Sequence, residues 1–168
     1  MNTSFERVKT GKDEWLTPPQ LIQPLGEFDL DPCSPVNRPW STAKAHYTKH
    51  DDGLALPWFG RVWLNPPYGN QTGKWMKKLA DHGNGVALTF ARTETKMFFD
   101  TVWNRADAIL FLRGRLKFHN VDGTPGNNSA GAPSCLIAYG ETNALSLDGM
   151  KDFGRYIRLL SAPTKGEK

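Results

Sequence analysis

An alternation of short apolar runs with helical patterns between residues 61 and 112 most constrains the fold. RVWL (61–64), GVALTF (85–90) and AILFL (108–112) have the length and composition of strands, and the last two are continuously apolar. Such continuous runs are typical of a sheet buried on both faces. GKWMKKLADHG and TETKMFFDTVWNRA, which lie between them, have helical patterns, and the first ends in a glycine suited to a helix C-cap. This order predicts a mostly parallel α/β sheet flanked by helices.

The flanking segments predict shorter elements. TPPQLIQPLGEF is typical of a short helix with Thr17 as N-cap, prolines in the first turn and Pro24 near its end. FDLDP predicts a brief strand that runs into a loop. Towards the C-terminus, RGRLKF and CLIAYG flank residues 119–134, a loop rich in glycine, proline and asparagine. A loop of this length inside a compact domain is usually functional or mobile.

Length and composition indicate a single domain over residues 15–162, with a partly ordered lead-in over 1–14 and a polar tail over 163–168. Hydrophobic content of 39% and charged content of 23% are ordinary for a globular protein. The net charge of +4 allows a polyanionic partner without requiring one. No signal peptide opens the chain and no apolar run approaches about 18 residues, so we expect no membrane association and a cytoplasmic location.

The residues typical of metal sites do not form a recognisable pattern. The two cysteines, Cys33 and Cys135, lie in no CxxC motif. His46 and His50 are four residues apart, but no HExxH pattern accompanies them, and they are more typical of surface histidines. We therefore expect no metal.

The tetrapeptide Asn65-Pro66-Pro67-Tyr68 interrupts the first strand of the alternation at its carboxyl end, the edge where open α/β sheets bind ligands. Two consecutive prolines stop the strand and hold the backbone rigid. The amide oxygen of Asn65 and the carbonyl of Pro66 are then two converging acceptors, which suit an –NH2 group with two protons to donate. Tyr68 supplies a flat face for a planar ring. A plain proline-rich turn is the alternative interpretation.

This arrangement fits transfer of a group to an aromatic amine. The lone pair of such an amine is delocalised into the ring, so the nitrogen is a poor nucleophile. Accepting both of its protons draws the nitrogen towards a pyramidal geometry and frees the lone pair. Acceptors that are already in place stabilise the developing charge without reorganisation, and alignment with the electrophile adds the advantage of proximity.

At this point the sequence resembles a known family. NPPY is similar to motif IV of the S-adenosylmethionine-dependent amino-methyltransferases. EWLTPPQL, FDLDPCSP, DDGLALPW, ARTETKMFF, LRGRLKF and PSCLIAYG resemble, in order, segments of the bacteriophage-type (Dam-like) DNA adenine-N6 methyltransferases. The resemblance extends from about residue 13 to residue 140. It implies a Rossmann-like class I methyltransferase fold, S-adenosylmethionine as cofactor, and methyl transfer to the N6 amine of adenine in double-stranded DNA after base flipping. It also implies a phage or prophage origin, and we take the protein to be a monomer.

The resemblance also assigns roles to individual residues, although the sequence departs from the usual pattern at two places. Cys33-Ser34-Pro35 stands where a glycine-rich turn would follow the first strand, and no clear ribose-binding acid ends a second strand. By resemblance the catalytic set is Asn65, Pro66, Pro67 and Tyr68. The resemblance places Thr17, Pro18, Asp31 and Pro32 around the methionine part of the cofactor. It implies that Asp51 or Asp52 contacts the ribose or adenine of the cofactor.

Basic and aromatic residues that follow the later strands are candidates for DNA contacts. Cationic side chains there would neutralise phosphates and position a duplex, although a solvated basic face explains them equally well. Phe118 would stack near a base or pack into the core, and the 119–134 loop would close over an extruded base or contact a groove. The predicted DNA-binding residues are Arg92, Arg113, Arg115, Lys117 and Phe118.

Two other functions stay open from the sequence. The NPPY motif also resembles the site of methyltransferases that act on RNA adenine or on protein glutamine amides, because these substrates also offer a planar NH2 group. A nucleic-acid-binding module without catalysis is a third interpretation, against which the intact motif argues.

Overall fold

The structure is a computed structural model that describes residues 14–160, so the predicted lead-in and tail lie outside it except for Glu14. Seven strands form one sheet in the order β2-β1-β3-β4-β6-β5-β7. The strands are β1 (Leu30–Asp31), β2 (Ala45–His46), β3 (Val62–Leu64), β4 (Gly85–Phe90), β5 (Ala108–Leu112), β6 (Ser134–Tyr139) and β7 (Gly154–Arg158).

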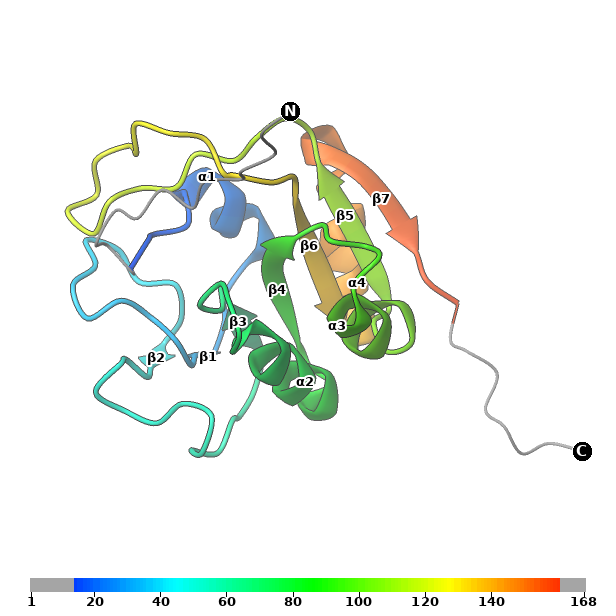
Figure 1. Ribbon diagram of the computed structural model, residues 1–168, viewed down its shortest axis with the longest axis horizontal. Helices are drawn as coiled ribbons and strands as arrows, with labels where there is room; N and C mark the ends of the chain where they lie inside the picture. Colours follow the sequence, from blue (N-terminus) through cyan, green and yellow to red (C-terminus); the bar gives the residue numbers. More distant parts are fainter. Residues whose placement is uncertain (1–13, 161–168) are drawn as a thin grey trace, which may run out of the picture.

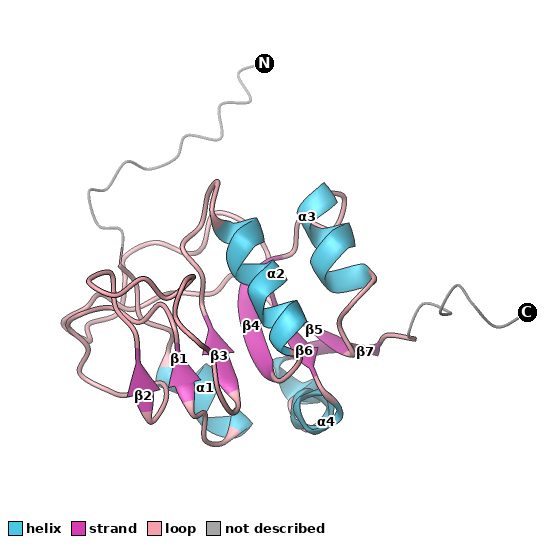
Figure 2. Ribbon diagram, turned by 90° about the horizontal axis from the view of Figure 1, so that it is seen from below, coloured by secondary structure: helices cyan, strands magenta, loops and turns pink. Residues whose placement is uncertain are grey.

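Helices cover both faces of this sheet, as predicted (Figure 2). α2 and α3 lie on one face, and α1 and α4 lie on the other. The α-helices are α1 (Pro19–Ile22), α2 (Thr72–His82), α3 (Lys96–Phe98) and α4 (Glu141–Asp148). The shorter elements are the 3-10 helices η1 (Gln23–Leu25) and η3 (Lys151–Phe153) and the π-helical segment η2 (Phe99–Trp103).

The sheet is mixed, so the prediction of a mostly parallel sheet is confirmed only in part. β1 pairs in parallel with β2 and β3, and β3 pairs in parallel with β4. β6 then lies between β4 and β5 and is antiparallel to both, and β7 is antiparallel to β5 at the edge. A continuous apolar run indicates a buried strand but not its direction. The order of elements along the chain therefore did not reveal that β6 runs back between two earlier strands.

Alternation along the strands sends side chains into two apolar cores, one on each face. Val62 and Leu64 pack with Trp75, Met76 and other residues of α2 on one face. On the other face, Trp63 packs in the cluster that contains residues of α1 and α4. β3, β4, β5 and β6 thus each contribute to both cores, which explains why these runs are apolar at consecutive positions.

The local sequence explains where the helices begin and end. α2 buries the apolar positions predicted from its spacing, and it ends at Gly83, whose φ of 75° is left-handed and whose N–H donates to the carbonyl of Leu79. α3 begins after Thr95, whose hydroxyl accepts a hydrogen bond from the N–H of Phe98. Among residues 14–160, no helix is both long enough and apolar enough to cross a membrane.

Candidate active site at the carboxyl ends of the strands

The candidate site lies where the strand order reverses. β1 pairs with β2 on one side and with β3 on the other, so the chain crosses back over β1 between β2 and β3. Ligands of open α/β sheets bind outside the carboxyl ends of the strands at such a reversal. Asp31 is the last residue of β1, and Asn65 directly follows β3. The sulfur of Cys33 joins the two turns by a hydrogen bond of 3.1 Å to the carbonyl of Asn65.

Of the backbone carbonyls of residues 65–67, one is available to accept a hydrogen bond from a ligand. The carbonyl of Asn65 accepts from Cys33, and the carbonyl of Pro67 accepts from the hydroxyl of Thr72 at 2.7 Å. Within residues 14–160, the carbonyl of Pro66 between them accepts no hydrogen bond. Thr72 also accepts from the N–H of Gly69 at 3.0 Å, which closes the turn onto the start of α2. The turn is therefore held on both sides of the one carbonyl that the sequence predicted to be an acceptor.

The side chain of Asn65 lies between two hydroxyl groups. Its Nδ2 donates to the hydroxyl of Thr17 at 3.4 Å, and its Oδ1 lies 3.5 Å from the hydroxyl of Tyr68. Thr17 is buried, and its side chain does not cap α1, because the N-cap is Pro18 and no side-chain cap is formed. The prediction that Thr17 is a helix cap is therefore wrong. Its hydroxyl instead orients the Asn65 amide, with the nitrogen towards Thr17.

Tyr68 is held between two other aromatic rings. One face of its ring stacks on Phe90, with centroids 4.3 Å apart and planes 18° from parallel, and the ring of Phe118 lies edge-on at 6.5 Å. The residue is 39% exposed, but its hydroxyl points inward, 3.5 Å from the carbonyl of Leu88. Burial of this hydroxyl raises the pKa of Tyr68 above its usual value, so the phenol stays protonated. Phe90 therefore covers one face of the Tyr68 ring and closes it to a planar ligand.

Phe90 was not among the residues predicted from the sequence. It is the last residue of β4, and its position in a continuously apolar run gives no reason to separate it from the core. Its place at the carboxyl end of the strand next to β3 is the only signal that points to the site.

Asp31 is a buried carboxylate, only 3% exposed. It accepts hydrogen bonds from the hydroxyl of Thr42 and, at 3.2 Å, from the N–H of Cys33. Burial raises the pKa of Asp31 to about 6, although both hydrogen bonds and the charge of Arg38 act in the opposite direction. Among residues 14–160, no lysine or arginine forms an ion pair with it. A buried carboxylate with these partners is suited to a cationic group of a ligand.

Asp51 and Asp52 lie in the loop beside this carboxylate, and both are exposed. The carboxylate of Asp51 accepts from the N–H and the hydroxyl of Thr48, and these two hydrogen bonds, the N–H first, lower its pKa. Asp52 accepts from the N–H of Ala55. Both side chains thus stabilise their own turns. The next residue, Gly53, lies against Pro32 so closely that a Cβ atom would be 2.2 Å from the Pro32 carbonyl oxygen.

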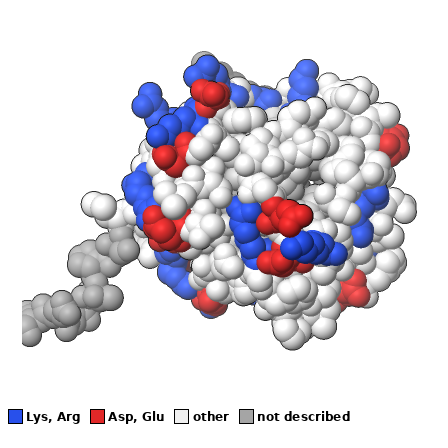
Figure 3. All heavy atoms as spheres, turned by 180° about the vertical axis from the view of Figure 1, so that it is seen from behind, with Lys and Arg blue, Asp and Glu red and all other residues white. Residues whose placement is uncertain are grey.

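Three of the predicted DNA-contacting residues lie around one hollow of about 340 Å³. Arg113, Arg115 and Lys117 line it together with Pro18 and His119. Arg92 lies elsewhere, with its guanidinium 5.9 Å from the centre of the Phe90 ring. On the face of the molecule that lies behind the view of Figure 1, basic and acidic side chains lie next to one another, so that face has no continuous positive charge (Figure 3).

The 119–134 loop contains no helix or longer strand, but backbone bonds hold it in place. The N–H and carbonyl of His119 both bond to Leu16 at 2.9 Å, and Gly126 donates to the carbonyl of Phe118 at 2.9 Å. The loop and the segment before α1 therefore lie side by side at the edge where β4 and β5 end (Figure 1). Within the described residues, no group of three or more His, Cys, Asp or Glu side chains forms a candidate metal site.

One comparison with known proteins identifies the family of the chain. The family described as DNA N-6-adenine-methyltransferase (Dam) matches residues 5–147, well over half of the chain. The chain belongs to this family. No curated protein and no solved structure matches it. The Dam match contains every residue of the candidate site described above, from Thr17 to Phe118, and ends within α4. η3 and β7 lie beyond it. The place between Asp31, Asn65 and Tyr68 is called the crevice below.

Proposed function

We propose that this chain transfers a methyl group from S-adenosylmethionine to the exocyclic N6 of adenine in double-stranded DNA. Membership of the Dam family supports the reaction and the nucleic acid. The observation that carries the residue assignment is the free carbonyl of Pro66 beside the oriented amide of Asn65. These two oxygens are the acceptors for the two protons of the target amine, as the motif predicts.

The crevice fits the proposed cofactor through the chemistry of its donors. The buried carboxylate of Asp31 would hold the amino group of the methionine part, and Thr17, Pro18 and Pro32 would contact the same part, as the resemblance implies. Asp51 or Asp52 would contact the ribose or adenine, from the loop that Gly53 presses against Pro32. When bound, the cofactor supplies a sulfonium methyl group as the electrophile.

The free face of Tyr68 receives the target base in this proposal. The N6 amine of adenine lies inside a duplex, so the base must be flipped out of the stack before it reaches the crevice. Phe90 covers the rear face of Tyr68, so the extruded adenine stacks on the opposite face, with its amine towards Asn65 and Pro66. Phe118 lies at the ring edge, and Arg92, Arg113, Arg115 and Lys117 would bind phosphates on either side.

The remaining features of the proposal come from the resemblance and the family. The fold is a Rossmann-like methyltransferase fold whose parallel half, β2-β1-β3-β4, contains the crevice. A bacterial or phage-infected cytoplasm is the compartment in which such an enzyme meets DNA. The chain acts as a monomer.

The test uses purified protein, methyl-labelled S-adenosylmethionine and unmethylated duplex DNA, which is then digested to nucleosides and separated. Label in N6-methyladenine is the expected result. Label in N4-methylcytosine would retain the mechanism and correct the base. Labelled RNA or protein glutamine in a competition assay, with no label in DNA, would refute the proposed substrate. Failure to bind the cofactor would support a binding module without catalysis.

A further inference from the structure

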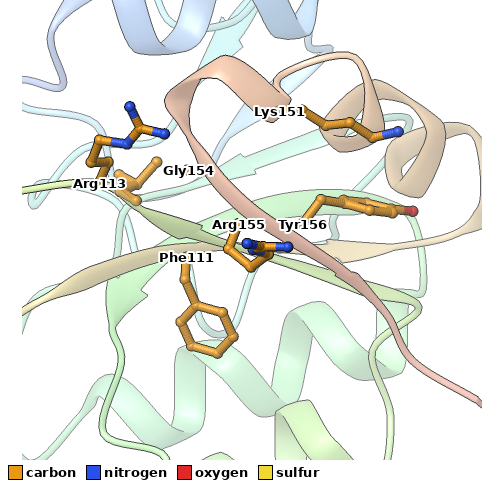
Figure 4. Close-up of a pocket in the computed structure, with 7 residues that line it drawn as sticks. Phe111, Arg113, Lys151, Gly154, Arg155 and Tyr156 are labelled. Carbon is orange, nitrogen blue, oxygen red and sulfur yellow. The ribbon is translucent and has the colours of Figure 1, made fainter.

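A hollow of about 690 Å³ lies outside the crevice (Figure 4). It is formed where β5 ends and β7 begins, next to η3. Its lining contains three cationic side chains and no carboxylate. The lining residues are Phe111, Leu112, Arg113, Lys151, Gly154, Arg155 and Tyr156.

Two of its three cations have no acidic partner within residues 14–160. Arg113 and Arg155 form no ion pair there, whereas Lys151 pairs with Asp148 at 2.8 Å. Arg155 lies opposite Phe111 in the β5–β7 ladder. Figure 4 shows the side chains of Arg113 and Arg155 beside the adjoining ends of β5 and β7. An arginine without a carboxylate partner is free to bind a phosphate through its planar, forked N–H groups. The hollow is therefore chemically suited to an anion.

This hollow continues the basic surface of the candidate site. Arg113 and Leu112 line both this hollow and the smaller one that contains Arg115 and Lys117. β5 is three strands away from β3 and β7 is four strands away, which places them about 14 Å and 19 Å from the crevice at a spacing of about 4.8 Å per strand. B-DNA carries one phosphate about every 3.4 Å of axis on each strand, so a duplex that has its target base at β3 and its axis across the sheet would pass phosphates over β5 and β7.

We propose that the hollow between β5 and β7 binds the phosphate backbone of the DNA duplex beside the target base, through Arg113 and Arg155. This inference rests on the proposed function and extends the DNA interface onto β7, beyond the part of the chain that matches the family. Such contacts read no sequence, and they fix the register of the duplex on the enzyme. Phe111 and Leu112 also line the hollow, and their side chains pack against the cores on opposite faces of the sheet.

Arg155→Gln tests the inference, and Arg158→Gln is the matched control. Both arginines lie on β7, but Arg158 is at its far end, opposite Ala108, and pairs with Glu141. The measurement is duplex affinity as a function of salt concentration, with the full chain. Loss of one phosphate contact reduces the slope of log affinity against log salt by about 0.9. We expect this change in Arg155→Gln, equally for cognate and unrelated duplexes, and an unchanged slope in Arg158→Gln.

The alternative outcomes separate this inference from the function on which it rests. Wild-type protein that binds duplex DNA, with equal slopes for wild type and Arg155→Gln, would overturn the phosphate site and leave the proposed function standing. Wild-type protein that binds no duplex would overturn both. Arg155→Lys keeps the charge and should restore most of the slope. Arg155 is exposed and forms no ion pair in the described residues, so we expect its substitution to leave the melting temperature unchanged.

Discussion

Asp31→Asn should make the protein more stable and at the same time unable to bind its cofactor. Asparagine has the shape of aspartate, so its oxygen still accepts from the N–H of Cys33 and its nitrogen donates to the hydroxyl of Thr42. The substitution removes only the ionisation of a buried carboxyl. The usual pKa of 3.8 rises to about 6 in the folded state. That difference corresponds to about 3 kcal/mol that the ionised group costs the folded protein.

The sign of the pH dependence follows from proton binding. Between pH 3.8 and pH 6 the folded state binds more protons at Asp31 than the unfolded state does, so rising pH lowers the stability of the wild type. The advantage of Asp31→Asn should be below about 1 kcal/mol at pH 4 and approach about 3 kcal/mol at pH 8. In a domain of this size, 1 kcal/mol shifts Tm by about 2–4 °C, so the gain at pH 8 is about 6–12 °C.

Thermal and urea unfolding at pH 4, 6 and 8 would measure this difference, with Asp152→Asn, an exposed carboxylate, as the control. Calorimetric titration with S-adenosylmethionine would measure binding, which should be lost in Asp31→Asn. In the wild type, affinity should fall by up to about tenfold for each pH unit below 6, because only the carboxylate attracts the amino group. Equal stability of the variant and wild type at pH 8 would refute the burial argument. Undiminished cofactor affinity would refute the role of Asp31.

Three further substitutions test other parts of the site. Asn65→Ala should abolish methyl transfer and leave cofactor affinity within a few-fold, so turnover in a labelled-methyl assay would contradict its role as acceptor. Phe90→Ala should remove about 1 kcal/mol of stacking behind Tyr68 and weaken base extrusion, which 2-aminopurine fluorescence in the target duplex would report. Phe90→Tyr should restore the stacking and the fluorescence. Equal fluorescence for wild type and both variants would refute the role of Phe90 in supporting Tyr68. Gly53→Ala should destabilise the fold by about 1–3 kcal/mol, because the alanine Cβ would overlap the carbonyl of Pro32. The same substitution should weaken cofactor binding. An unchanged midpoint of urea unfolding would refute the close contact between Gly53 and Pro32.

Local patterns were sufficient to predict the elements that each form from a short stretch of sequence. α2 and its glycine cap follow from helical spacing, and β4 and β5 follow from continuous apolar runs. The positions of Asp31 and Asn65 at the carboxyl ends of two strands likewise follow from the sequence, because each stands where an apolar run meets a proline. In both cases the signal is contained within a few neighbouring residues.

Features that depend on distant contacts were not predictable in the same way. The insertion of β6 between β4 and β5 is decided by which apolar faces pack best, and all three strands are apolar on both faces. Thr17 has the residue type and spacing of a helix cap, yet its hydroxyl meets Asn65, 48 residues away. Phe90 becomes a partner of Tyr68 only because β3 and β4 are neighbours. These outcomes depend on tertiary packing, which local propensity does not determine.

The reversed direction of β6 has a consequence for how this enzyme could be re-engineered. β5 ends and β6 starts at the same edge of the sheet, so residues 113–133 leave and re-enter the sheet on the side that contains the candidate site. Lengthening a surface loop costs little, about 0.6 kcal/mol for each doubling. New recognition segments inserted into this stretch would be delivered beside the target base, while the strands that hold Asp31 and Asn65 stay unchanged. The fold thus provides a graft site at which sequence preference is exchanged separately from methyl-transfer chemistry.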